Sequence, residues 1–93
     1  MRHFIIVKWK DPAAMRGKTE EIEAIFRKTL EIPGIHSVEL HPSCSNRPNR
    51  YDLMIEIGMD EAALPAYDGS DPHHEWKDTY GPSIEQKAIF DCM

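Results

Sequence analysis

The sequence predicts an α+β domain of the ferredoxin-like βαββαβ type, with two helices on one face of a four-stranded antiparallel sheet. The predicted elements follow one another in the order strand, helix, strand, strand, helix, strand, which is the split βαβ arrangement. The chain has 93 residues, of which 41% are hydrophobic and 29% are charged. This length and composition are typical of one globular domain, so we expect residues 1–93 to fold as a single unit.

The first predicted strand covers residues 3–9 and is apolar on both of its faces. Its alternating side chains form two sets, namely His3, Ile5, Val7 and Trp9 on one face and Phe4, Ile6, Lys8 and Lys10 on the other. Apolar residues on both faces indicate burial on both sides. Since helices of the same chain can cover only one face, we expect something else to cover the other.

The main predicted helix begins at Thr19, a favourable N-cap residue, and runs to about Glu31. Its apolar stripe has helical spacing and consists of Ile22, Ile25, Phe26, Thr29 and Leu30. Pro33 and Gly34 end this helix before a second strand at residues 35–40. The polar residues 41–50 are expected to form a long connection. His36 and His41 lie five positions apart, so on a regular strand they face opposite ways and do not share a metal.

The remaining elements are a third strand at residues 51–57, a short helix from Asp60 to Tyr67, a second helix after Asp71 and a last strand at residues 83–90. In the third strand the face toward the helices is expected to carry Tyr51, Leu53, Ile55 and Ile57. The face of the sheet without helices is expected to carry Phe4, Ile6, Met54 and Ile89, mixed with Lys8, Glu56 and Lys87.

That open face predicts a homodimer. A contiguous exposed apolar patch usually marks an interface. Two sheets packed face to face around a two-fold axis would bury the patch, and the interspersed charges could pair across the interface. The alternative is a monomer in which the open face of the sheet is partly wet.

The stretch from Ala66 to Tyr80 concentrates aromatic and imidazole side chains. Asp71 is a favoured N-cap residue and Pro72 suits the first helical position, which places His73 and His74 in the first turn. The positive end of the helix dipole favours neutral imidazole there, and a neutral imidazole can accept a proton. The alternative is a surface helix with two exposed histidines.

Several classes of protein are disfavoured by the composition. A net charge of -5 without a run of Lys and Arg argues against a nucleic-acid partner. No apolar run approaches the roughly 20 residues of a membrane span, and we expect no signal peptide. Reduced thiols at Cys44 and Cys92 favour a cytoplasmic location. Without a Gly-rich phosphate loop or paired zinc-ligand spacings, we predict no cofactor and no metal.

Several segments in order resemble the stress-responsive A/B-barrel (Dabb) family of dimeric α/β-barrel proteins. They are His3-Phe4-Ile5-Ile6-Val7-Lys8-Trp9-Lys10, Ile32-Pro33-Gly34-Ile35, Tyr51-Asp52-Leu53, Ala63-Leu64 to Tyr67, Pro72-His73-His74 and Phe90-Asp91. The resemblance covers nearly the whole chain. It implies a homodimer whose two sheets form a barrel, which agrees with the argument from the open face.

The resemblance also implies site residues. A plant member of the family is a polyketide cyclase that uses a tyrosine and a histidine of the pattern Tyr-x-x-His-Pro-x-His, together with a first-strand histidine. Carried over, these positions match Tyr67 and His3, while Asp71 replaces the first histidine of the pattern. The last histidine is His74 when counted from Pro72 and His73 when counted from Tyr67. We favour His74, because the helix start defines the local geometry better than the preceding turn.

The resemblance therefore predicts a pocket for a small apolar or carbonyl-bearing molecule between sheet and helices. In it, His74 would remove a proton next to a carbonyl and Tyr67 would hydrogen-bond the enolate oxygen. The remaining predicted pocket residues are His3, Ile5, Val7, Trp9, His73 and Trp76. Two alternatives are a non-enzymatic stress-associated or accessory binding protein, and a relative of the haem-degrading monooxygenases of the same superfamily. A strand histidine such as His3 is more often structural, and aromatic residues such as Tyr67 and Trp76 more often belong to the core.

Overall fold

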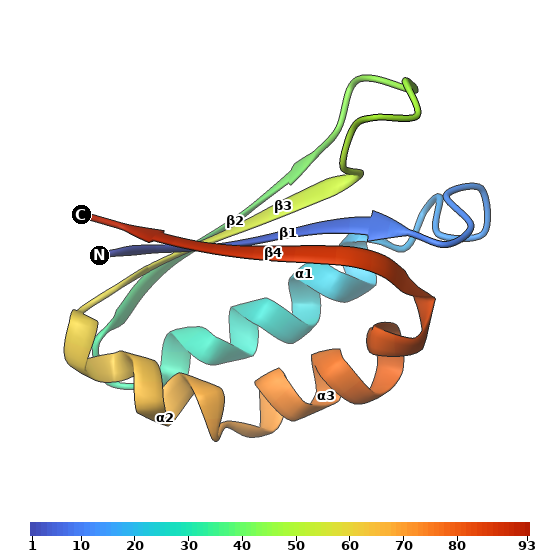
Figure 1. The fold of residues 1–93 in the computed structure, drawn as a ribbon. Helices are drawn as coiled ribbons and strands as arrows, with labels where there is room; N and C mark the ends of the chain where they lie inside the picture. Colours follow the sequence, from blue (N-terminus) through green and yellow to red (C-terminus); the bar gives the residue numbers. More distant parts are fainter.

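The computed structural model describes all residues 1–93, and its sheet has the strand order β2-β3-β1-β4 with antiparallel neighbours throughout (Figure 1). The strands are β1 (Arg2–Trp9), β2 (Ile35–Pro42), β3 (Leu53–Met59) and β4 (Ile84–Cys92). The helices are α1 (Thr19–Arg27), α2 (Leu64–Asp68) and α3 (Asp71–Tyr80). Short 3-10 turns lie at Lys28–Glu31, Glu61–Ala63 and Gly81–Ser83. The predicted ferredoxin-like βαββαβ fold is confirmed.

The helices lie on one face of the sheet and leave the other face without cover from this chain (Figure 1). Burial alternates strictly along β1 and β3. Successive side chains of a strand point to opposite faces, so every second side chain points into the helix layer. Ile5, Val7, Ile55 and Ile57 are all at most 2% exposed. Aromatic rings join the layers, since the Trp76 ring lies 5.1 Å from that of Phe26 on α1 and 6.2 Å from that of Trp9.

The starts of the helices differ from the predictions. Thr19 is the first residue of α1, and Lys18 precedes it without a capping side chain. Ser70 is the N-cap residue of α3 in place of Asp71, because its Oγ accepts a hydrogen bond from the His73 amide at 3.3 Å. The same Oγ donates to the Tyr67 carbonyl at 2.7 Å and so links the end of α2 to the start of α3. Asp60 makes no capping bond either.

The strands also correct two predictions. Tyr51 precedes β3 and is 38% exposed, so it does not belong to the face under the helices. In β4 the pairing sets Phe90 opposite Phe4 and Ile89 opposite Ile5. Directly opposed residues share a face, so Phe90 lies on the open face and Ile89 on the helix side, the reverse of the prediction. Lys87, opposite Val7, moves to the helix side with Ile89.

No helix of the structure has both the length and the apolar character needed to cross a membrane. Cys44 and Cys92 are both free thiols.

Candidate functional site

A cavity of about 290 Å³ lies between the sheet and the helices, at the end of the molecule where β1 begins and β4 ends. Strands β1 and β4 and helices α2 and α3 contribute to its wall. The lining residues are His3, Ile5, Leu64, Tyr67, Asp68, His73, Trp76, Lys77, Lys87, Ile89 and Asp91. Five of these side chains are apolar and six are polar or charged. The wall is therefore more polar than that of most small-molecule sites.

His3 is held in one orientation by a carboxylate of the neighbouring strand. The register of β1 and β4 sets His3 opposite Asp91, and His3 Nδ1 lies 2.5 Å from Asp91 Oδ1. His3 is 5% exposed. A carboxylate accepts the proton of Nδ1, which leaves Nε2 of a neutral ring with a free lone pair.

Tyr67 is 1% exposed, and its hydroxyl group has no hydrogen-bond partner in the chain. The His3 ring lies 5.4 Å from the Tyr67 ring in an edge-on arrangement, and the His73 ring lies 4.8 Å away. Burial, with a smaller contribution from the nearby Asp68 carboxylate, raises the pKa of Tyr67. The hydroxyl therefore keeps its proton at neutral pH and remains a hydrogen-bond donor.

The structure separates the two neighbouring histidines. His73 lines the cavity together with Trp76 and Lys77, which are three and four positions further along α3 and so share its face. His73 Nδ1 lies 2.8 Å from the Asp68 carbonyl oxygen. Since a carbonyl only accepts, Nδ1 carries the proton and Nε2 is the basic nitrogen.

His74 is turned away from the cavity by one helical step. It is exposed, does not line the wall, and its Nδ1 lies 2.9 Å from the Ser70 carbonyl oxygen. The pattern counted from Tyr67 thus finds the histidine of the cavity, whereas the count from Pro72 does not. The two counts differ because the N-cap of α3 was predicted at Asp71, whereas Ser70 is the N-cap residue in the structure.

Four further predicted residues are divided between the cavity and the core. Ile5 and Trp76 lie in the wall of the cavity, but Val7 and Trp9 do not. Val7 is fully buried, and Trp9 borders a second hollow of about 300 Å³ near Thr19 and Pro42. The reason is length, because a strand rises about 3.3 Å per residue and Trp9 is therefore roughly 20 Å from His3.

Several residues of the wall were not predicted, namely Leu64, Asp68, Lys77, Lys87, Ile89 and Asp91. The partner of His3 depends on the register of β1 and β4, which brings Asp91 beside His3. Lys77 could have been found from its helical spacing to His73. The position of Lys87 depends on the register of β4.

Several solved protein structures have a fold similar to that of this chain. No family model matches the chain, and no curated protein matches it. A dimeric ferredoxin-like protein of unknown function from Thermobifida fusca is 18% identical, with a TM-score of 0.79 over 96% of this chain and 85% of that one. A Dabb family protein from Mesorhizobium loti is 19% identical, with a TM-score of 0.65 over 99% of this chain and 93% of that one.

The chain has the fold of the Dabb proteins. This fold also occurs in a hydroxynitrile lyase from Passiflora edulis, which is 16% identical, with a TM-score of 0.71 over 96% of this chain and 87% of that one. Three neighbours of this fold, from Thermobifida fusca, Jannaschia and Bacteroides fragilis, are described as dimeric proteins of unknown function. At these identities the comparison concerns the fold, and the function of this Dabb-fold protein has to be argued from its own residues.

Proposed function

We propose that the cavity binds a small carbonyl-containing molecule. His73 removes a proton from the carbon next to the carbonyl, and Tyr67 stabilises the negative charge that develops on the carbonyl oxygen. The observation that carries this proposal is the Tyr67 hydroxyl, which is buried at the wall of the cavity without a partner. An unpaired buried hydroxyl costs about 1–3 kcal/mol of stability. A ligand oxygen would supply the missing acceptor.

In the proposed step, Nε2 of His73 takes the proton from the carbon next to the carbonyl. The electron pair of the broken C–H bond forms a C=C bond, and the π electrons of the carbonyl move to its oxygen. The Tyr67 hydroxyl donates a hydrogen bond to this developing enolate oxygen. The raised pKa of Tyr67 keeps the phenol protonated, so it donates the bond without giving up its proton.

His3 would act as a second polar contact for the ligand. Asp91 Oδ1 lies 2.5 Å from His3 Nδ1, so Nε2 is the ring nitrogen left to face a ligand. Asp91 is a positioning residue in this scheme, since it acts through His3. Lys77 and Lys87 in the wall are balanced by Asp68 and Asp91, so the wall does not select for a net charge on the ligand.

The hydroxynitrile lyase of the same fold is consistent with this class of ligand, because a hydroxynitrile is formed from a carbonyl compound. The second candidate function is binding without turnover, as in an accessory protein. The half-apolar wall would serve such a protein equally well.

Deuterium exchange tests the proposal directly. We would incubate the protein in D₂O with 2-heptanone, an apolar methyl ketone, and follow loss of the α-proton signals by NMR. We expect the wild type to accelerate exchange over buffer, and His73→Ala and Tyr67→Phe to lose about 100-fold or more of the acceleration. His74→Ala is the matched control and should exchange like the wild type.

Two outcomes would contradict the enzymatic assignment. Loss of exchange in His74→Ala with retention in His73→Ala would move the base out of the cavity. If 2-heptanone raises the thermal stability of the wild type without any exchange, the protein binds the carbonyl compound but does not react with it, as the second candidate function states.

We further propose that a second copy of the chain covers the open face of the sheet; solved proteins of this fold are described as dimeric. Phe4 and Phe90 form an aromatic pair on that face with ring centroids 6.3 Å apart, and Phe90 is 59% exposed. Ile6 and Met54 are opposite each other in the register and only half-buried. These four residues, which we term the apolar patch, would gain burial in a two-fold dimer.

A further inference from the structure

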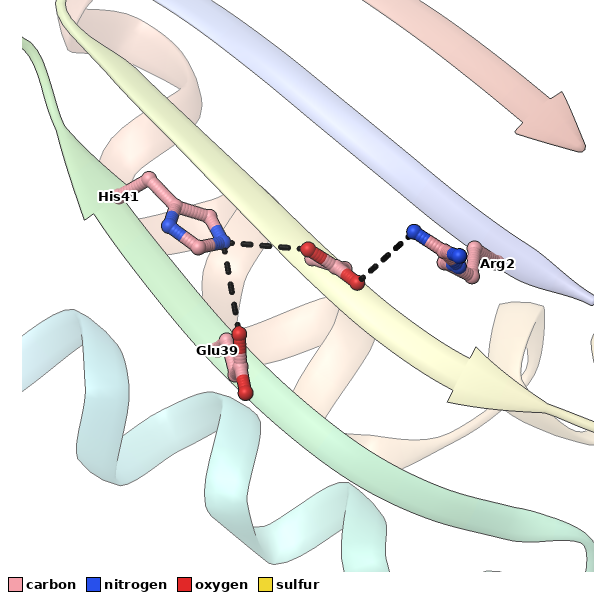
Figure 2. Close-up of polar contacts among 4 residues, drawn as sticks. Arg2, Glu39 and His41 are labelled. Carbon is pink, nitrogen blue, oxygen red and sulfur yellow. Dashed lines mark hydrogen bonds and ion pairs between the residues drawn. The ribbon is translucent and has the colours of Figure 1, made fainter.

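The open face also carries a polar cluster on β2 and β3 that the proposed reaction does not use. Glu39 and His41 are two positions apart on β2 and therefore share a face. Glu56 lies on β3 directly opposite Glu39 in the register. The side chains of the cluster converge above the sheet (Figure 2).

This Glu-His-Glu cluster sets two carboxylates opposite each other, and the Arg2 guanidinium at 4.0 Å from Glu56 offsets only part of their repulsion. Like charges directly opposite each other on antiparallel strands destabilise the pair. His41 Nε2 lies between the two carboxylates, 3.1 Å from Glu56 Oε1 and 3.7 Å from Glu39 Oε2. One nitrogen and two oxygens thus lie within 4.8 Å of one another around a common point.

We propose that Glu39, His41 and Glu56 bind a divalent transition-metal ion of the Zn²⁺ class. Zinc bound tetrahedrally by nitrogen and oxygen at about 2.1 Å places two neighbouring ligand atoms about 3.4 Å apart. The distances of 3.1 and 3.7 Å from the His41 nitrogen lie on either side of this value. Glu39 and His41 are exposed, so water completes the coordination. Two carboxylates also cancel the charge of the ion.

The ligand set selects the kind of metal. Imidazole together with carboxylate suits zinc and its neighbours in the first transition row, whereas magnesium and calcium take oxygen ligands. Arg2 supports the site from outside, because its guanidinium lies 4.0 Å from Oε2 of Glu56 while Oε1 faces His41 (Figure 2). Arg2 therefore contacts the oxygen that the ion does not use, which orients the ligand.

A second surface histidine provides a matched control within the same chain. His36 Nε2 lies 2.9 Å from Asp60 Oδ1, and both side chains are exposed. In this pair the distance from the histidine nitrogen to the carboxylate oxygen is similar to the 3.1 Å between His41 and Glu56, but the second carboxylate is missing. The proposal therefore predicts that His41 binds the ion and that His36 does not.

Calorimetric titration with ZnCl₂ at pH 7.5 tests the site. The wild type should bind one ion per chain, and His41→Ala and Glu56→Gln should each weaken binding by at least about ten-fold. His36→Ala should bind as the wild type does. Circular dichroism without metal verifies that each variant is folded. Wild-type affinity in His41→Ala, or equal loss in His36→Ala and His41→Ala, would overturn the proposal.

Selectivity and pH separate this site from a general acidic surface. Binding should weaken at pH 5.5, because the imidazole must lose its proton to bind the ion. MgCl₂ at the same concentration should give no binding, and equal affinity for Mg²⁺ and Zn²⁺ would refute the site. His73→Ala should keep the wild-type zinc affinity, so failure of this proposal and failure of the proposed reaction are distinguishable.

Discussion

At the scale of one residue, the buried and unpaired Tyr67 hydroxyl lowers the stability of the fold next to the cavity. The tyrosine ring is packed between His3 and His73, yet its hydroxyl is left without a partner. Selection for stability alone would favour phenylalanine at such a position, since the ring packs equally well and no polar group is buried. In the proposed function, a ligand oxygen would supply the acceptor that this tyrosine lacks.

We expect Tyr67→Phe to raise the free energy of unfolding by about 1 kcal/mol while it removes the exchange activity. Chemical denaturation of the wild type and the variant measures the difference. A loss of stability in Tyr67→Phe would show that the hydroxyl is satisfied in the folded protein. The matched control is Tyr80→Phe, which removes the hydrogen bond from the Tyr80 hydroxyl to Glu21 at 2.9 Å and should be destabilising.

The same tyrosine predicts a pH dependence. The folded state raises the pKa of Tyr67 above its ordinary value of 10.0, so above pH 10 the unfolded chain loses this proton while the folded protein keeps it. Its contribution to stability is therefore fully present below pH 10 and declines as the pH rises. Urea unfolding at pH 9 and pH 11 should show a smaller decline in Tyr67→Phe than in the wild type. An equal decline would contradict the raised pKa.

At the scale of one element, α3 is positioned by the serine that precedes it. Ser70 accepts a bond from the His73 amide and donates one to the Tyr67 carbonyl, so one hydroxyl connects both proposed reacting residues. The helix is short and has a single apolar stripe with Trp76 and Tyr80, so its N-terminal turn depends on this cap.

Ser70→Ala should lower the stability by about 1 kcal/mol and reduce exchange, because the turn that presents His73 loses its cap. Asp71→Ala is the control; it removes the side chain predicted as the cap and its charge near the helix dipole, so a smaller loss of about 0.5 kcal/mol is expected. Thermal unfolding compares the two variants. A larger loss in Asp71→Ala than in Ser70→Ala would identify Asp71 as the cap.

At the scale of the whole molecule, the open face joins the apolar patch and the Glu-His-Glu cluster. Burial of the patch by a second copy would bring the cluster near the interface as well. Two neighbouring carboxylates are costly to remove from water. A bound divalent ion would cancel both charges, so the zinc site and the proposed dimer are compatible on one face.

Phe90→Asp should shift the protein toward monomer in sedimentation experiments at micromolar concentration. Each copy loses the burial of one large side chain, worth about 2 kcal/mol, and gains a charge in the interface. Thr79→Asp adds the same charge to an exposed position of α3 and should leave the association unchanged. A wild type that sediments as a stable monomer would refute the dimer.

Much of this molecule could be predicted from local patterns alone. Alternation along β1 showed which residues point to the helices, and the spacing in residues 22–30 identified the buried side of α1. Both signals depend only on the period of a strand or a helix, which is a local property of the backbone. They suffice for the order of the elements and hence for the ferredoxin-like fold.

The site depended on contacts that no local pattern contains. The register of β1 and β4 decided that Asp91 meets His3 and that Ile89 faces the helices, and a slip of one residue would have reversed both. The turn at Ser70 decided between His73 and His74, because one residue rotates a helical side chain by about 100°. The sequence alone therefore determined the layers of this protein, whereas only the tertiary structure decided which side chains meet in the cavity.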